Sequence, residues 1–506
     1  MAWFAASLLL PWWAAYGLVG WCDRPARRDG AATFLRAGLA LGIGVGLSSC
    51  GYFLWLLLVG PPGKLYHACD LTVFAAIGLC GLVFRRTAAT AGHPSGLPFE
   101  TERRWQRLLL ATFMAAMALA VLAAIGVYWK DPLGDWDAWA IWNQRARFVF
   151  RAGDQWRQAF GPMFEHVDYP LLVPSGNARL WSYLGGEPAW APWLLGTLFT
   201  FATVGVLAAG LSRLRSRSQG LLAGLVLLGV VAFLQRGAWQ YADVPLAFYL
   251  LATVLLSLLY DAAERPPAGL LVLSGLMAGM AAWTKNEGLL LLVILPATRA
   301  AILWRRGCAR QAPRELLQWV LGAAPLLAVV AMQKLCLAGS NYLVNDRTWE
   351  AVLRQLADGS RYWQVMQSLL LYTARIARPF AIVLPLSALL LGRAHKPAPG
   401  RRGLSGAFLV LALQLAGYFF VYVLTPCDLQ WHLATSTDRL LLQLCPLCLL
   451  VLFVWLATPE EVFAQEAAQC GVRETHHSLV MPVRFTRPPV TAPHYAVRDN
   501  CRLPAD

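Results

Sequence analysis

Apolar runs long enough to cross a bilayer recur along the whole sequence, with short polar segments between them. A membrane-spanning helix needs about 20 predominantly apolar residues, and thirteen segments qualify as predicted spans, although 268–283 is short for one. This pattern predicts an all-α polytopic membrane protein with about 12–13 transmembrane helices. The predicted spans are 2–20, 34–60, 70–84, 107–129, 191–211, 219–235, 243–260, 268–283, 288–304, 317–337, 366–392, 405–425 and 440–457.

The charge of the loops predicts which side of the membrane each loop faces. Loops rich in arginine and lysine face the cytoplasm, and such loops lie at 25–28, 85–107, 213–217, 305–314 and 393–402. With these loops inside, the spans alternate in direction without conflict. The segments left outside hold nearly every polar residue that is unusual near a membrane, so we expect a functional periplasmic face. They are 130–190, 235–243, 283–288, 338–365 and 425–439.

Composition agrees with this interpretation and excludes others. The 506 residues are 58% hydrophobic and 14% charged, far from the balance of a soluble domain. The net charge of +15 belongs to the cytoplasmic loops, so it does not indicate a nucleic-acid partner. The 11 cysteines are scattered and form no disulfide framework. The N-terminus lacks the features of a cleaved signal peptide, and the residue usage favours a multi-pass protein of the bacterial inner membrane.

Small residues recur at four-residue spacing in two of the predicted spans. Gly38, Gly42 and Gly46 form one set, and Gly275 and Gly279 form the other. Small residues at this spacing let membrane helices approach closely, so we interpret both sets as packing features.

The stretch GDWDAWAIWNQRAR at 134–147 places two aspartates in the first external loop. Residues 136–152 are predicted to form an amphipathic helix, with Trp139 and Trp142 on an apolar face that suits the membrane interface. Asp135 then stands where a helix N-cap belongs. Asp137 lies in the first turn, where the helix dipole explains it only weakly. Asp137 is therefore favoured over Asp135 for chemistry.

Further external positions carry groups with two open interpretations each. Glu165, His166, Asp168 and Tyr169 stand together, either as a cation or substrate site or as a solvated loop. Asp243 begins a span either as a helix cap or as a carboxylate at the mouth of the helix bundle.

Two external cations have the same ambiguity. Lys285, followed by Asn286 and Glu287 in a tight turn, either reaches the head groups or binds a lipid phosphate. Arg439, preceded by His432 and Asp438 at the outer end of the last span, has a guanidinium suited to bidentate phosphate contact. Carboxylates as bases and cations for a departing phosphate are what a lipid-phosphate substrate requires.

The order of these motifs resembles the class C glycosyltransferases, membrane enzymes that use polyprenyl-phosphate sugars. The likeness is greatest to the protein O-mannosyltransferase and lipid A aminoarabinose transferase group (glycosyltransferase family 39-like). In that group an aspartate after a span precedes an amphipathic helix, a Gly-Asp-aromatic stretch and a Tyr/Pro-Pro-Leu run. The corresponding features here are Asp137, the helix to Arg151, Gly153-Asp154-x-Trp156 and Tyr169-Pro170-Leu171.

Three later motifs extend the resemblance over residues 105–457. An Asp-x-Pro-Leu span start is similar to 243–246, a Leu-Thr-Lys-Gly turn to 283–286, and an Arg-Tyr-Leu-x-Pro stretch to 438–446. The chain departs from the group in two places. Ala138 stands where the group commonly has a second acid, and Asp168 replaces a lysine that often precedes the Pro-Pro-Leu run.

The resemblance implies a domain organisation and a mechanism. Residues 1–104 would be additional N-terminal helices, 105–457 the class C membrane core with its catalytic loop at 130–190, and 458–506 a polar, loosely ordered cytoplasmic tail. Asp137 would deprotonate an acceptor hydroxyl on a lipid, glycan or protein. That oxygen would displace the phosphate of a polyprenyl-phosphate sugar with inversion.

In this mechanism Lys285 and Arg439 would bind the leaving phosphate, and Asp243 would orient the acceptor or the sugar. Asp135, His166, Asp168, Tyr169 and Glu287 would support them. No cofactor is required, although the acidic and histidine cluster at 165–168 leaves a divalent metal open. Two other functions stay open, a secondary transporter and a non-catalytic protein of lipid-linked glycan assembly.

Overall fold

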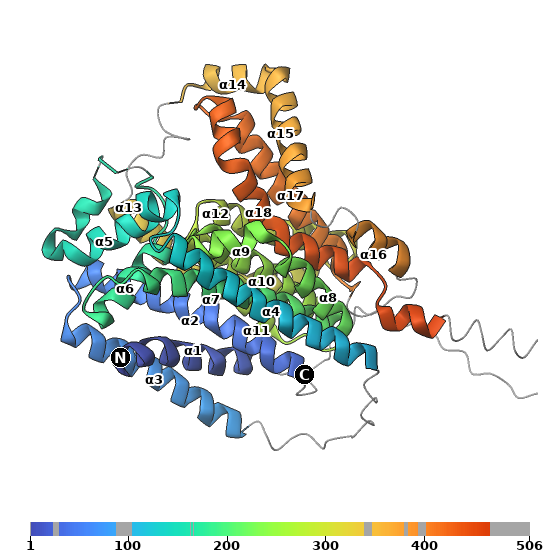
Figure 1. Ribbon diagram of the computed structural model, residues 1–506, viewed down its shortest axis with the longest axis horizontal. Coiled ribbons are helices and arrows are strands. Elements are labelled where there is room, and N and C mark those ends of the chain that lie inside the picture. The colour runs from blue at the N-terminus through green and yellow to red at the C-terminus, as the bar shows by residue number, and fades with distance from the viewer. Residues whose placement is uncertain are drawn as a thin grey trace, which may run out of the picture.

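The protein is a bundle of helices, described from a computed structural model (Figure 1). The structure describes residues 2–23, 30–87, 104–161, 163–164, 166–337, 347–378, 383–392 and 401–465. Most of the expected tail at 458–506 lies outside these residues. Within the described part the regular elements are all helical, which confirms the predicted all-α class.

The helices follow the order of the predicted spans, with short helices in the external loops. The N-terminal half contains α1 (Ala2–Cys22), α2 (Gly30–Leu58), α3 (Lys64–Thr87), α4 (Arg104–Lys130), η1 (Ala138–Trp142), α5 (Asn143–Arg151), η2 (Gly153–Phe160), α6 (Leu172–Leu184), α7 (Trp190–Leu214), α8 (Arg217–Leu228) and α9 (Val231–Ala238). The C-terminal half contains α10 (Asp243–Ala262), α11 (Ala268–Thr284), α12 (Glu287–Arg305), η3 (Ala309–Gln311), α13 (Ala312–Cys336), α14 (Trp349–Ala357), α15 (Gly359–Ala377), α16 (Val383–Leu391), α17 (Leu404–Val423) and α18 (Leu429–Trp455).

Ten described helices are long and apolar enough to cross a membrane, which confirms a multi-pass protein. α11, with 17 residues, is the short span expected at 268–283. The expected span at 219–235 is not continuous: α8 and α9 meet at an angle of 68°. The helix is interrupted at Val230, whose ψ of 84° leaves the helical region. The segment expected as one span at 366–392 falls on α15 and α16, and residues between them lie outside the described part.

α10 is the centre of the bundle. Every residue of this helix from Asp243 to Leu259 is buried inside the protein. Helices α7, α11 and α18 pack around it. Close approach at glycines contributes to this packing. A Cβ on Gly275 would lie 1.9 Å from the carbonyl oxygen of Trp319, and one on Gly42 would lie 2.1 Å from Cε1 of Phe248. The interpretation of both glycine sets as packing features is therefore confirmed where α11 meets α13 and α2 meets α10.

The N-terminal helices are attached to the rest of the bundle by a buried ion pair. α1 and α3 lie side by side along one edge of the molecule, opposite α14 (Figure 1). On α6, Arg179 donates to Oδ2 of Asp70 on α3 at 2.6 Å and to the carbonyl oxygen of Ser7 on α1 at 3.0 Å. The hydroxyl of Tyr183 also donates to the Asp70 carboxylate, at 2.6 Å. One guanidinium therefore joins three helices.

Replacing Arg179 by methionine is expected to lower the free energy of unfolding by about 3–5 kcal/mol, because Asp70 would be left buried without its cation. Arg151→Met is the matched control, since Arg151 is exposed where it pairs with Glu187, and exposed pairs contribute little. Thermal or denaturant unfolding of the detergent-purified proteins measures the loss of stability in both variants. Equal losses in the two variants would contradict this assignment.

Candidate functional site

One cavity of about 520 Å³ gathers most of the polar residues that the sequence analysis selected. Its walls come from the helix at 136–151, the loop that follows it, the α9–α10 and α11–α12 connections, α17 and α18. Six of the predicted residues line it directly: Asp137, His166, Tyr169, Lys285, Glu287 and Arg439. Asp135, Asp168 and Asp243 lie behind the wall and bond to residues that form it.

Asp137 is held near the start of the helix at 136–151 and forms an ion pair with Arg439 of α18. Gly134, with φ of 79°, makes the turn before this helix. The segment Ala138–Trp142 is a π-helical turn, a local widening that is frequent at functional sites. Asp137 is only 9% exposed and makes no side-chain cap. The carboxylate expected to act as a base therefore lies against the cation expected to bind phosphate.

Arg439 is placed differently from the sequence prediction. The last span was expected to begin at residue 440, but α18 begins eleven residues earlier, at Leu429. Arg439 therefore projects from within a long helix rather than from its outer end. His432, Thr435 and Ser436, from the preceding turns of α18, line the same cavity.

The prediction that Asp135 caps the helix is wrong. Only its backbone carbonyl takes part in the first turn, as acceptor from Ala138 N–H at 2.9 Å. Its carboxylate instead accepts a hydrogen bond of 3.0 Å from the hydroxyl of Tyr241 and lies 3.8 Å from Arg236. Burial, and then the nearby carboxylate, raise the pKa of Tyr241, although Arg236 opposes them. Tyr241 therefore stays protonated and can act as a donor.

The interfacial interpretation of the helix at 136–151 holds for one tryptophan and fails for another. Trp139 is 43% exposed, whereas Trp142 is fully buried and stacks on Tyr169 with ring centroids 5.5 Å apart. Ala146 and Val149, on the same face, are buried as well. This face packs on protein because α6 lies against α5. The helix therefore positions the cavity wall rather than only anchoring the loop in the membrane.

Lys285 is at the centre of the most buried polar cluster of the site. Its Nζ lies 2.9 Å from Oδ1 of Asp243 and 3.0 Å from Oε1 of Glu287. Burial alone would lower the pKa of Lys285, but the two carboxylates outweigh burial and hold it well above the usual range. Lys285 is therefore charged at neutral pH. Its contribution to stability persists up to alkaline pH and is lost only as the pH rises through its raised pKa.

Asp243 belongs to this cluster and does not cap α10. The N-cap position of α10 is Ala242, which makes no side-chain cap. The Asp243 carboxylate accepts from Nζ of Lys285 and, at 2.5 Å, from Nε2 of Gln443 on α18. The side-chain amide oxygen of Gln443 accepts from the hydroxyl of Tyr418 at 2.8 Å. The cluster thus connects α10, the α11–α12 turn, α17 and α18.

The predicted group at 165–169 separates into two parts. Glu165 lies outside the described residues. His166 adopts a φ of 54° and stacks on Tyr169 with ring centroids 4.5 Å apart, and both side chains line the cavity. The Asp168 carboxylate accepts a hydrogen bond of 2.7 Å from Nδ2 of Asn286. Among the described residues no group of three His, Cys, Asp or Glu side chains is arranged to hold a metal ion.

Asp168 fixes the loop to α12 and α13. Lys334 donates to Oδ1 of Asn286 at 2.8 Å and to the carbonyl oxygen of Asp168. Behind this group, Arg145 donates to the carbonyl oxygen of His166 at 3.0 Å. Burial lowers the pKa of Arg145 to about 10, so this guanidinium stays charged at neutral pH. These contacts hold the backbone that presents His166 and Tyr169 to the cavity.

Among the polar residues of the site that were not selected from the sequence are Arg236, Tyr241, Gln443 and Lys334. Arg236 and Tyr241 lie in an external segment whose polar content was noted without singling them out, and Arg236 pairs with Asp438 at 2.6 Å. Gln443 stands within an apolar span, and a polar residue in a span is by itself a signal of function or packing. Lys334 lies near the end of α13, where a lysine is usually explained by contact with the head groups.

The charges of the site are paired before any ligand binds. Arg236, Lys285 and Arg439 each face at least one carboxylate. Asp135, Asp137, Asp243, Glu287 and Asp438 thus surround three cations. An anionic ligand therefore competes with a carboxylate for each cation. The polar end of the cavity is continuous with an apolar wall that includes Leu290, Val421 and Leu440.

The chain matches no protein-family model, no curated protein and no solved structure.

Replacing Lys285 by methionine is expected to lower the free energy of unfolding by about 3–5 kcal/mol, because Asp243 and Glu287 would be left without their cation. Lys130→Met, at the exposed end of α4, is the matched control and should be nearly neutral. Denaturant unfolding of both variants in the same detergent measures their free energies of unfolding. A Lys285→Met protein as stable as the control would show that the cluster does not hold the helices together.

Proposed function

We propose that the protein is a glycosyltransferase that moves a sugar from a polyprenyl-phosphate donor to an acceptor hydroxyl, with inversion. The observation that carries the proposal is the Asp137–Arg439 pair beside Lys285 in one cavity. A base for a hydroxyl and two cations for a phosphate are the groups this reaction needs. The order of motifs that resembles the class C glycosyltransferases supports the same reaction.

The reaction would proceed by direct displacement. The acceptor oxygen attacks the anomeric carbon from the side opposite the phosphate and forms the new glycosidic bond. The bond between this carbon and the phosphate oxygen breaks, and its electron pair stays on the phosphate. Asp137 receives the proton of the acceptor hydroxyl. Arg439 and Lys285 stabilise the negative charge of the leaving polyprenyl phosphate.

The ion pair between Asp137 and Arg439 supports a mechanism in which the donor binds before Asp137 acts as a base. While Asp137 is bonded to Arg439, its lone pairs are engaged and it is a weak base. A donor phosphate competes with Asp137 for the guanidinium, which can bind either anion with similar geometry. Arrival of the donor would thus release the carboxylate next to the anomeric carbon, where a base is needed. Asp243 and Glu287 would keep Lys285 in position throughout.

The apolar wall supports a lipid-linked donor over a soluble one. Leu290 on α12 and Val421 on α17 border the cavity next to Lys285 and Tyr418. Val421 is 41% exposed on the flank of a predicted membrane span. The isoprenoid chain would lie along this apolar wall. The distribution of basic loops supports a position of this cavity on the periplasmic face of a bacterial inner membrane.

Loss of the protein is expected to remove one sugar from an envelope glycan, lipid or glycoprotein. Mass spectrometry of lipids and glycans from a deletion strain, beside a strain that carries Asp137→Asn, measures this change. The two strains should share the defect, while Glu350→Gln, a change at an exposed glutamate of another external segment, should restore the wild-type profile. A deletion profile identical to that of an expressing wild type would overturn the proposal, and a normal profile with Asp137→Asn would favour non-catalytic binding.

The same substitution should act in opposite directions on rate and on binding. Asp137→Asn is expected to lower the transfer rate about 10²–10⁴-fold through loss of the base. It should also tighten binding of undecaprenyl phosphate about fivefold. The asparagine no longer competes as an anion for Arg439, and the lost ion pair contributes about 1 kcal/mol. Arg439→Gln should weaken this binding. Binding to the purified protein in nanodiscs, measured beside Glu350→Gln, tests the exchange, and unchanged affinity in Asp137→Asn would refute it.

A secondary transporter is the second candidate, and one observation favours it. The break between α8 and α9 makes a discontinuous span, which is common around transporter binding sites, and Arg236 of α9 lines the cavity. Uptake of a solute into proteoliposomes that contain the purified protein would support this function over the transferase. Retained uptake in Asp137→Asn, together with no change in envelope glycans, would establish it.

A further inference from the structure

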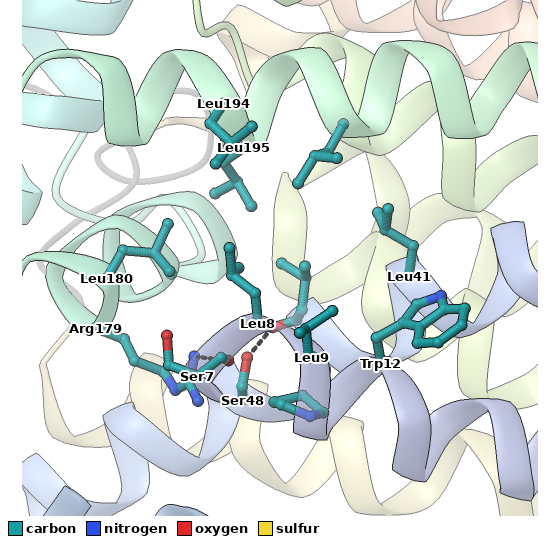
Figure 2. Close-up of a pocket in the computed structure, with 14 residues that line it drawn as sticks. Ser7, Leu8, Leu9, Trp12, Leu41, Ser48, Arg179, Leu180, Leu194 and Leu195 are labelled. Atoms are coloured by element: carbon teal, nitrogen blue, oxygen red, sulfur yellow. Dashed lines mark hydrogen bonds between the residues drawn. The ribbon is translucent and has the colours of Figure 1, made fainter. Parts of the chain in front are cut away.

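A second cavity, of about 360 Å³, lies where the first two helices meet α6 and α7 (Figure 2). Its lining is mainly leucine, from all four helices, together with Trp12 of α1. Among the described residues it shares no lining residue with the cavity that holds Asp137. It is therefore a separate site, between the N-terminal helices and the core.

Apart from Nε of Arg179, which makes no hydrogen bond to the described residues, the few polar groups around this cavity are engaged within the protein. Ser7 and Ser48 donate to backbone carbonyl oxygens of their own helices, at 2.7 Å and 3.0 Å. The two terminal nitrogens of the Arg179 guanidinium donate to Ser7 and Asp70. Because Asp70 neutralises Arg179, the cavity presents no free cation to a phosphate. Its ligand must be hydrocarbon.

The depth of the cavity gives the same result. Leu9 and Trp12 lie in the middle third of the 21 residues of α1, and Leu41 and Val45 in the middle third of the 29 residues of α2. With a rise of about 1.5 Å per residue, these positions of α1 and α2 fall inside a hydrocarbon layer about 30 Å thick. The lining residues of α7, Leu194, Leu195 and Leu198, lie in the outer third of that helix, so the cavity extends from the middle of the layer towards its outer face.

The cavity also opens towards the bilayer. Leu9 is 60% exposed, and Leu8, Leu41, Leu194 and Leu198 at its rim are half-buried. In a membrane this opening faces lipid chains, the surrounding solvent of the bundle. A gap of this size left empty would forfeit the dispersion contacts of its lining.

We propose that this cavity binds one acyl chain of a bilayer phospholipid, which fills the space between the N-terminal helices and the core. The isoprenoid chain of a polyprenyl phosphate is a poorer occupant. Such a lipid, with its phosphate at Lys285 and Arg439, would lay its chain along the wall that includes Leu290 and Val421, whereas this cavity is bounded by α1, α2, α6 and α7. The proposal does not depend on the glycosyltransferase function.

The test is to fill the cavity and count the retained lipid. Val45→Phe places a ring in the cavity, and Val73→Phe, on the exposed face of α3, makes the same change outside it. The proteins are purified in mild detergent and analysed by native mass spectrometry, with the released lipids identified after extraction. We expect about one phospholipid per chain in the wild type and in Val73→Phe, and at least a fivefold lower occupancy in Val45→Phe.

Photolabelling of the wild type makes the result independent of how Val45→Phe folds. A phospholipid with a diazirine in the middle of its acyl chain, reconstituted with the protein in vesicles, should label peptides of α1, α2 and α7 around the cavity. Equal lipid retention in all three proteins would overturn the proposal. So would labels confined to other helices, or a retained lipid that proves to be a polyprenyl phosphate.

Discussion

The interaction on which the site depends is the buried contact of Lys285 with Asp243 and Glu287. A charge inside an apolar bundle is stable only when a partner and hydrogen bonds compensate for its lost hydration. Here the partners come from separate parts of the chain: the start of α10, the α11–α12 turn and, through Gln443, the middle of α18. Meeting the requirement of one ammonium group therefore fixes three elements relative to one another. The same elements carry Tyr241, Glu287 and Arg439 into the cavity, so its shape follows from this cluster.

Much of the fold and of the site composition could be predicted from the sequence. Apolar runs and basic loops identify nearly all the spans, because hydropathy and charge act locally along the chain. The alternation of spans placed Asp137, Lys285 and Arg439 on one face, and the structure brings them to one cavity. The sequence does not show which side chain each charged group of the site pairs with. Asp135 has the position of an N-cap, yet Tyr241 competes for its carboxylate from more than a hundred residues away. Such contacts depend on tertiary geometry and leave no local pattern.

The errors in the fold have the same origin. A hydropathy window cannot distinguish a straight span from one bent at Val230, because both are equally apolar. Nor does the helical wheel of 136–152 show whether Trp142 faces lipid or protein, since both environments accept an apolar ring. Trp142 became buried because α6, which the sequence analysis did not predict, packs against α5 and carries Tyr169 and its loop over the indole. In membrane proteins the identity of the apolar neighbour is a property of the assembled bundle.

The rule that buried charges must be paired also restricts what the site can bind. A cavity with free cations would attract any anion, whereas here each cation already holds a carboxylate. A ligand gains only the difference between its own contacts and those it replaces, so a singly bonded anion gains little. A phosphate that reaches both Arg439 and Lys285, with a hydrocarbon chain against Leu290 and Val421, adds contacts that no internal carboxylate makes. Under the proposed function, selectivity for a lipid-linked phosphate would follow from the pairing of each cation with a carboxylate, and Asp137 would be the carboxylate that the exchange releases.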